Sequence, residues 1–125
     1  MTTFVVDASV VLKWLRDEEG SEEARTLARE HLVAPPLLHL EVISVAARKW
    51  RWREEALLEL VRQLERSGVV VDQPPLAGVA RWAARGLSAY DATYVALAEL
   101  HDCKLVTTDA EILELAAGVA TPLTS

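Results

Sequence analysis

The chain has 125 residues, of which 51% are hydrophobic and 26% charged, with a formal net charge of −6. This composition is ordinary for one folded domain and excludes a disordered chain, while the negative charge argues against a general duplex binder that relies on a broad basic surface. No apolar run reaches the roughly 18 residues of a membrane span, and the N-terminus lacks the basic head and apolar body of a signal peptide. The single cysteine excludes an internal disulfide and a cysteine-rich zinc site. We expect one domain over residues 1–125, in a reducing cytoplasm and without membrane contact.

Short runs rich in β-branched and aliphatic residues predict strands along the chain. The first run ends at Asp7, and the three consecutive valines that end at Val71 give the clearest strand signal. Strands are expected at residues 3–6, 32–34, 69–71 and 104–107, with a last extended piece at 119–123.

Helical spacing of apolar residues predicts helices between these strands. The first helix follows Asp7 and ends at Gly20, and Ser21 then caps the second. Further helices are expected at residues 37–49, 53–66, 76–85 and 88–101, and a short one after Asp109. Strands that alternate with helices indicate an α/β domain, in which a mostly parallel central sheet is flanked by helices.

Two acidic residues stand at the ends of predicted strands. Asp7 follows the first strand, and Asp109 lies just past the strand at 104–107. Ligands gather at the carboxyl ends of strands in open parallel sheets, so both residues are candidates for a site. Aspartate is also a favoured N-cap, and each residue precedes a predicted helix. Both interpretations stay open at this point.

Glu41 is expected on an apolar helix face. Its neighbours four residues away on either side are Leu37 and Val45, which share one face of a helix with it. An unpaired buried carboxylate is costly, so Glu41 should have a partner such as a metal ion, an arginine or another polar group. The alternatives are a glutamate at the edge of the helix, or an ion pair with Arg48 or Lys49.

Asp91 repeats this pattern between Leu87 and Val95. Its alternative is specific, because Ser88 and Asp91 have the spacing of a capping box, with aspartate in place of the usual glutamate or glutamine. The two interpretations have equal weight.

The four acids carry more information together than singly. Four carboxylates that converged would repel one another unless cations neutralised them. Oxygen-only ligands suit Mg²⁺ or Mn²⁺, and paired divalent ions about 4 Å apart are a standard device for phosphodiester hydrolysis. Spacing in the sequence does not by itself establish that the four converge.

Four segments resemble PIN-domain proteins, and among these the VapC toxins of bacterial and archaeal toxin–antitoxin pairs. They are residues 5–14 (VVDASVVLKW), 34–42 (APPLLHLEV), 86–98 (GLSAYDATYVALA) and 105–109 (LVTTD). The match covers nearly the whole chain, and the order and spacing of the motifs are together specific. The resemblance implies a three-layer PIN-like domain with the activity of a metal-dependent endoribonuclease.

The resemblance also implies roles for individual residues and for partners. The acids would gather around Mg²⁺ or Mn²⁺, a hydroxyl residue would support them, and a small polar residue follows the first acid. The implied partners are an RNA substrate, a second copy of the chain in a homodimer, and a cognate antitoxin that places a basic side chain in the acid pocket. The implied catalytic and metal-binding acids are Asp7, Glu41, Asp91 and Asp109, and the supporting residues are Thr107 and Ser9.

One strong basic cluster has two tryptophans interleaved in it. Its cations could bind RNA phosphates while the indoles stack on unpaired bases. Alternatively the segment is a junction between helices, with solvated cations and with tryptophans in the core or at a dimer interface. We favour packing for Trp50 and Trp52 and leave the role of the cations open. The cations are Arg48, Lys49, Arg51 and Arg53.

Three other functions compete with a toxin ribonuclease. A PIN nuclease that processes RNA without a toxin role would have the same site. A phosphoacceptor receiver domain needs an aspartate after a middle strand and a lysine after a late strand, but residues 50–57 contain no aspartate and Lys104 precedes its strand. The intact set of acids argues against a non-catalytic module that only binds a partner.

Overall fold

The computed structural model of the protein describes residues 1–124, which form five strands and seven helices. The strands are β1 (Thr3–Val6), β2 (His31–Ala34), β3 (Val70–Val71), β4 (Lys104–Thr107) and β5 (Ala120–Pro122). The helices are α1 (Ala8–Leu15), α2 (Ser21–Leu27), α3 (Leu37–Arg48), α4 (Glu54–Arg66), α5 (Leu76–Ala84), α6 (Ala89–Leu100) and α7 (Ala110–Leu115).

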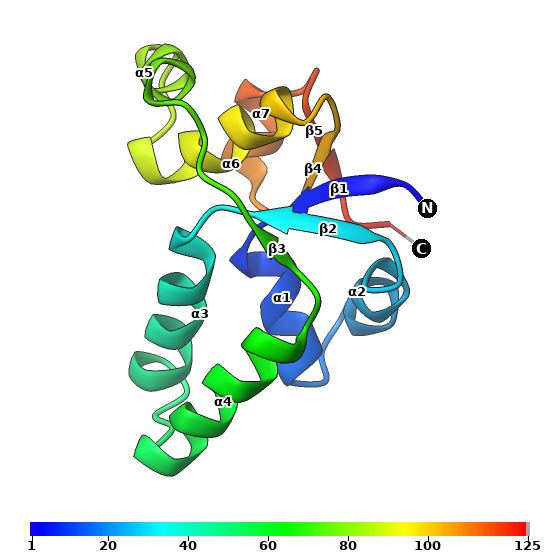
Figure 1. The fold of residues 1–125 in the computed structure, drawn as a ribbon, viewed down its shortest axis with the longest axis vertical. Helices are drawn as coiled ribbons and strands as arrows, with labels where there is room; N and C mark the ends of the chain where they lie inside the picture. The colour runs from blue at the N-terminus through cyan, green and yellow to red at the C-terminus, as the bar shows by residue number, and fades with distance from the viewer. Residues whose placement is uncertain (125) are drawn as a thin grey trace.

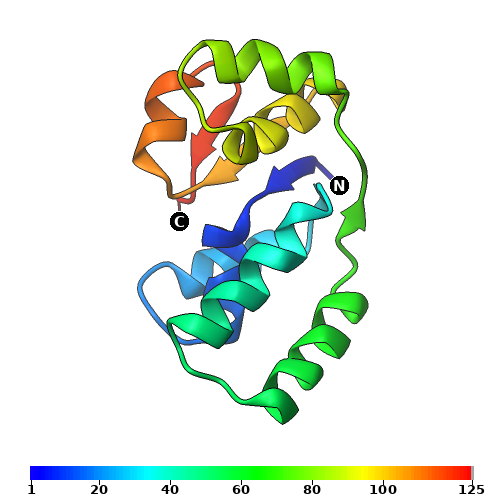
Figure 2. The ribbon, with the colours of Figure 1, turned by 90° about the vertical axis from the view of Figure 1, so that its left-hand side faces the viewer.

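The strands form one parallel sheet in the order β3-β2-β1-β4-β5 (Figure 1). The central strand is β1, where Val5 lies opposite Val33 of β2 and Leu105 of β4, and all three side chains are fully buried. Helices α1 to α4 lie on one side of the sheet and α5 to α7 on the other, so the molecule has three layers (Figures 1 and 2). This confirms the predicted α/β fold with a parallel sheet between helices.

The register of the sheet places the ends of β1 and β4 side by side. Val6 of β1 pairs with Val106 of β4, so the residues that follow the two strands leave the same edge of the sheet. Helix α1 begins directly after β1, and α7 begins three residues after β4. Asp7 and Asp109 are therefore brought to one edge by the parallel pairing alone.

The segment between α1 and α2 differs from the prediction. Helix α1 ends at Leu15, because Arg16 is already extended, and does not continue to Gly20. The prediction that Ser21 caps α2 is also wrong, because Gly20 with φ +88° occupies the cap position. The Ser21 hydroxyl instead donates to the Arg16 carbonyl at 3.1 Å and accepts from the Glu18 amide at 2.9 Å. Its side chain fixes the turn that precedes the helix.

The run of valines forms the shortest of the described strands. Strand β3 contains Val70 and Val71 alone, paired with Val33 and Ala34 at the edge of the sheet. Both side chains are about half exposed, at 47% and 44%. The predicted strand is confirmed at residues 70–71, and it is an edge strand with one partner.

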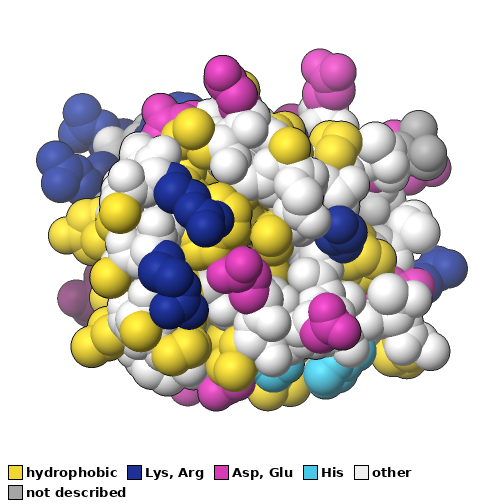
Figure 3. All heavy atoms as spheres, turned by 90° about the horizontal axis from the view of Figure 1, so that it is seen from above, with side chains coloured by type: hydrophobic (Ala, Val, Ile, Leu, Met, Phe, Trp, Pro, Cys, Tyr) yellow, Lys and Arg dark blue, Asp and Glu magenta, His cyan; other side chains and the backbone are white. Residues whose placement is uncertain are grey.

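The layer of α5 to α7 presents several hydrophobic side chains to solvent, with basic side chains between them (Figure 3). The large exposed hydrophobic residues of this layer are Leu76, Tyr90, Leu100 and Leu115. Such a surface is typical of an interface with another polypeptide. Within residues 1–124, no helix has the length and apolar character needed to cross a bilayer.

The turn between α5 and α6 contains a glycine with a positive φ, whose conformational role can be tested by substitution. Gly86 has φ +114°, and a Cβ at this position would meet only Leu115 Cδ1, at an ordinary 3.5 Å. Gly86→Ala should therefore destabilise the fold through backbone strain, by about 1–3 kcal/mol in urea unfolding. Gly118→Ala is the matched control, because Gly118 has no positive φ and open space around it, so its stability should change little. Equal losses in the two variants would contradict this account.

Candidate functional site

Asp7 is a buried carboxylate whose two oxygens are both hydrogen-bonded. It is 6% exposed and caps α1, with Oδ1 accepting from the Ser9 amide at 3.1 Å and from Ser9 Oγ at 2.5 Å. Oδ2 accepts from the hydroxyl of Thr107, which is fully buried at the end of β4. The predicted N-cap of Asp7 is confirmed, and the same side chain ties β1 to β4.

The hydroxyls of Thr107 and Ser9 extend this network to the loop after β4. Thr107 Oγ1 accepts from the Asp109 amide, and Ser9 Oγ accepts from the Thr108 amide, both at 3.0 Å. Asp109 Oδ1 in turn accepts from the Ile112 amide at 3.0 Å, which confirms Asp109 as the N-cap of α7. For both aspartates, capping fixes the side chain at the sheet edge, so the cap and site interpretations are compatible.

Glu41 lies one position away from the face that was expected. The fully buried stripe of α3 consists of Leu38, Val42 and Ala46, and Glu41 is half-buried beside it. Its carboxylate accepts a hydrogen bond from the hydroxyl of Tyr94 on α6.

The ion pair of Glu41 with Arg48 or Lys49, kept as an alternative, is absent within residues 1–124. Sequence reasoning missed Tyr94 as the partner, although its position on the face of Asp91 and the need of a buried hydroxyl for a partner were available signals.

Asp91 stands in the first turn of α6. Ser88 caps this helix, and its Oγ accepts from the Asp91 amide at 3.0 Å, which confirms one half of the predicted capping box. The reciprocal bond, which the Ser88 amide would donate to the Asp91 carboxylate, is absent in the described part of the chain. The half-buried Asp91 carboxylate is therefore available for other contacts.

The charges of the acids act on one another in pairs. Burial raises the pKa of the Glu41 carboxyl, the Tyr94 hydrogen bond opposes this shift, and the charges of Asp7 and Asp91 raise the pKa further. Burial also raises the pKa of Asp91, and the charges of Asp109 and Glu111 add to it. Glu111 is a fifth acid near the cluster, and its place in the first turn of α7 gave no sequence signal beyond helix capping.

The pKa values of Asp7 and Tyr94 are both raised. Burial raises the pKa of the Asp7 carboxyl above its ordinary value, against the hydrogen bonds from Ser9 and Thr107, which lower it. The pKa of the Tyr94 hydroxyl is raised far above its ordinary value, chiefly by burial and then by its bond to Glu41. Tyr94 is therefore the proton donor in its bond with Glu41.

The donor set has the chemistry of a site for a hard divalent cation. It offers carboxylate and hydroxyl oxygens, which Mg²⁺ and Mn²⁺ prefer, and its pKa values are those of carboxylates that lack a neutralising charge. No three acidic, histidine or cysteine side chains within residues 1–124 close around one point tightly enough to hold an ion by themselves. Mg²⁺ usually keeps several waters, so the arrangement fits an ion bound partly through water.

The basic cluster begins at the end of the helix that carries Glu41, outside the acid site. Arg48 is the last residue of α3 and lies seven residues after Glu41, about 10 Å along the helix axis, while the other three cations follow the helix. Trp50 and Trp52 are half-buried against the core with ring centroids 5.3 Å apart, which confirms packing as their role. The four cations of the cluster are exposed, and none of them has a carboxylate partner in the described chain: Arg48, Lys49, Arg51 and Arg53.

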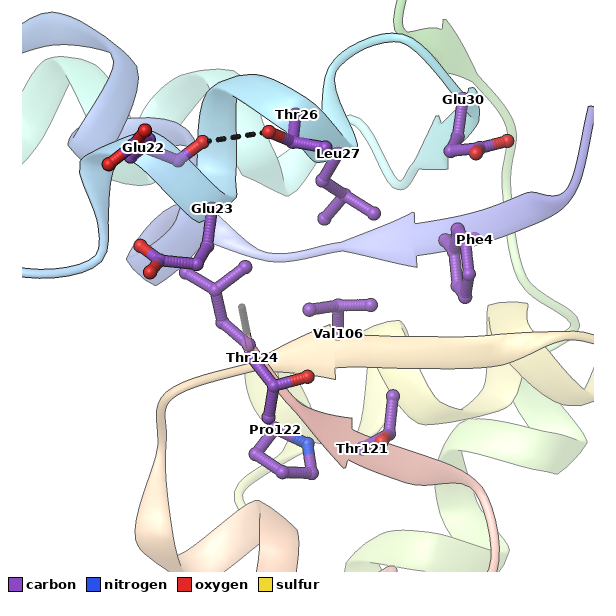
Figure 4. A pocket seen from close by; sticks show the side chains of 11 residues that line it. Phe4, Glu22, Glu23, Thr26, Leu27, Glu30, Val106, Thr121, Pro122 and Thr124 are labelled. Carbon is purple, nitrogen blue, oxygen red and sulfur yellow. Dashed lines mark hydrogen bonds between the residues drawn. The ribbon is translucent and has the colours of Figure 1, made fainter.

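Two larger hollows lie away from the acids. A pocket of about 610 Å³ lies between α2 and the strands β1, β4 and β5, with Phe4 and Val106 on the strands and Glu22, Glu23 and Glu30 on the side of α2 (Figure 4). A second, of about 720 Å³, lies at the opposite edge of the sheet, where β1 and β4 begin. Neither is lined by a predicted site residue.

The model of the PIN domain family matches residues 4–118. The chain belongs to the PIN domain family. VapC ribonuclease Mb0985 of Mycobacterium bovis and ribonuclease VapC9 of Mycobacterium tuberculosis are each 36% identical to it over 109 residues, which is 84% of either chain. Membership in this family removes the receiver domain as an alternative.

Solved structures share the whole fold. PAE2754 from Pyrobaculum aerophilum has a TM-score of 0.73 and 27% sequence identity, covering 98% of this chain and 90% of its own. VapBC-1 from nontypeable Haemophilus influenzae also has a TM-score of 0.73, with coverage of 99% and 100%, but its 14% identity limits the likeness to the fold.

The raised pKa of Glu41 predicts an unusual effect on stability. A carboxyl whose folded-state pKa is raised keeps its proton when the unfolded chain has released it, so stability falls as pH rises from the ordinary carboxyl range, at about pH 4, through the raised value. Glu41→Gln removes the charge and keeps an oxygen that can accept from Tyr94. In chelator near neutral pH, this variant should melt a few degrees above the wild type, and its stability should depend less on pH.

Adding Mg²⁺ should narrow or reverse this difference, because an ion that binds the folded site stabilises it by mass action. Glu65→Gln is the control, since Glu65 is exposed and makes no ion pair in the described chain, and its melting temperature should stay close to that of the wild type. A Glu41→Gln protein that melts lower in chelator would show that the ionised carboxylate stabilises the fold.

Proposed function

We propose that this chain is the endoribonuclease toxin of a toxin–antitoxin pair and hydrolyses phosphodiester bonds of RNA at the acid cluster. The observation that supports the proposal is that the carboxylates influence one another's pKa values, Glu41 with Asp7 and Asp91, and Asp91 with Asp109, in a chain 36% identical to two named VapC ribonucleases. The same acids would serve an RNA-processing nuclease, and the two functions differ in their partners.

In this proposal Asp7, Glu41, Asp91 and Asp109 hold Mg²⁺ or Mn²⁺. Such an ion, when bound, supplies an activated water and neutralises charge on the phosphate. The chain supplies the framework: the Ser9 and Thr107 hydroxyls fix both oxygens of Asp7, and the caps of α6 and α7 hold the backbones of Asp91 and Asp109. The buried donors keep Asp7 in one orientation while the half-buried acids face the substrate side.

The proposed partner is a cognate antitoxin that binds the chain and places a basic side chain among the acids. A cation there would relieve the repulsion that raises the pKa values of Glu41 and Asp91 and would compete with a metal ion. The shared fold with VapBC-1 is consistent with this partner. The homodimer implied by the resemblance stays a prediction, for which the exposed hydrophobic residues of α5 to α7 offer a surface.

Removing the charge of Asp91 should abolish cleavage. Asp91→Asn keeps the size of the side chain, and its main-chain bond to Ser88 persists, so the fold should stay intact. We expect RNA cleavage in saturating Mg²⁺ to fall by about 100-fold or more, as for loss of a charged ligand. Asp102→Asn is the control, because Asp102 is exposed near the start of β4 and asparagine tolerates its φ of +49°. Undiminished cleavage by Asp91→Asn would refute the proposed site.

The basic cluster should contribute to RNA affinity and not to chemistry. In a double variant, Arg48→Ala is combined with Arg51→Asn, since asparagine tolerates the φ of +61° at that position. Affinity for a single-stranded RNA should fall, and the slope of log K against log salt should flatten by about 0.7 for each phosphate that the variant no longer neutralises. Turnover at saturating RNA should fall less.

A matched variant separates this effect from net charge. Arg62→Ala with Arg66→Ala also removes two positive charges, but from residues that both pair with Glu59 on α4. We expect a smaller loss of affinity in this control. Equal losses in the two double variants would assign the effect to the overall charge of the chain and not to the basic cluster.

A further inference from the structure

Tyr94 links the two helical layers at the acid site. It lies on α6, one turn after Asp91, and its side chain is 1% exposed. Its hydroxyl donates to Oε1 of Glu41 on α3, on the other side of the sheet (Figures 1 and 2). Within residues 1–124, this is the one hydrogen bond that joins α3 to α6.

Glu41 depends on this bond for its orientation. Its neighbours Asp7 and Asp91 both repel the carboxylate, and no cation lies within ion-pair distance in the described chain. Helix α3 packs on α1 and α4, while α6 packs on α5, β1 and β4, so the two helices are held by different neighbours. Without the hydroxyl, repulsion would turn the half-buried side chain of Glu41 toward solvent.

The kind of donor also matters. A lysine or arginine at this place would hold Glu41 equally well, but its charge would fill the role of a metal ion. The Tyr94 hydroxyl is neutral and remains protonated, so it holds the carboxylate without cancelling its charge. A neutral donor therefore leaves the full negative charge of the cluster available to a cation.

We propose that Tyr94 is a positioning residue, which holds the Glu41 carboxylate beside Asp7 and Asp91 and thereby increases the affinity of the acid cluster for a divalent cation. This inference rests on the proposed function, because it takes Glu41 to be one of the residues that hold the ion. Tyr94 acts through Glu41 and does not itself touch the reacting groups.

The test is a double-mutant cycle read by calorimetric titration of the metal-free protein with Mn²⁺. Tyr94→Phe keeps the buried ring and removes the hydroxyl, and we expect the Kd for Mn²⁺ to rise by about 10-fold, as for loss of an outer-shell partner. In a Glu41→Gln background the same change should have little further effect, because the group that Tyr94 positions is no longer a ligand. Tyr90→Phe is the matched control, since Tyr90 is 66% exposed on the same helix.

Two outcomes of the cycle would overturn the proposal. Either Tyr94→Phe binds Mn²⁺ as tightly as the wild type, or it weakens binding by the same factor with and without Glu41. The second outcome would mean that Tyr94 supports the fold and not the carboxylate. Absence of Mn²⁺ binding by the wild type, together with cleavage that survives Asp91→Asn, would overturn the proposed function as well, so the two failures are distinguishable.

A measurement on the unmutated site covers the case in which Tyr94→Phe does not fold. The chain has two tyrosines, so labelling tyrosine with ¹³C at Cζ gives two resonances, which Tyr90→Phe assigns. We expect the Tyr94 resonance to shift as Mg²⁺ saturates the site, and to shift much less in Glu41→Gln. A Tyr94 resonance that ignores Mg²⁺, or that shifts equally in Glu41→Gln, would refute the proposal.

Discussion

The hydrogen bond from Thr107 to Asp7 is the contact on which the rest of the site depends. It joins the ends of β1 and β4 through two buried side chains, at the point where both strands stop. A buried carboxylate is costly, and here hydroxyl and amide donors offset part of that cost without introducing a cation. The same donors fix the orientation of the Asp7 carboxyl at the end of β1.

The surrounding acids reduce stability, and the core compensates for this. Burial and repulsion by neighbouring acids raise the pKa values of Glu41 and Asp91. The ionised form of each carboxyl is therefore less favourable in the folded protein than in the unfolded chain. The sheet beneath them consists of fully buried aliphatic residues such as Val5, Val33 and Leu105. The hydrophobic core can stabilise the fold despite the repulsion between the acids, because the acids lie outside the core. In the proposed function, a cation bound at this edge would relieve the repulsion and stabilise the fold.

The sequence predicted the order of the elements well, because periodicity and turn residues are local signals. It also predicted Asp7 and Asp109 at one sheet edge, since parallel pairing dictates that placement. Contacts between distant segments were the weak point. The face of Glu41 was off by one position, and Tyr94 was missed as its partner 53 residues away. The predicted cap at Ser21 failed for a related reason, because a contact of its hydroxyl with the turn before the helix overrode a clear local preference.

Charge imposes a last constraint on how an RNA substrate could approach. The chain carries a net charge of −6, and its proposed site consists of carboxylates, so the phosphate backbone would be repelled from the proposed place of cleavage. Binding then requires exposed cations near the acids but outside them. Helix α3 meets this requirement, with Glu41 in its second turn and Arg48 at its end, about 10 Å apart along its axis. A single rigid helix can thus hold a carboxylate that repels RNA phosphates and a cation that attracts them at a fixed spacing. That spacing limits which phosphates of a bound RNA can reach the acids.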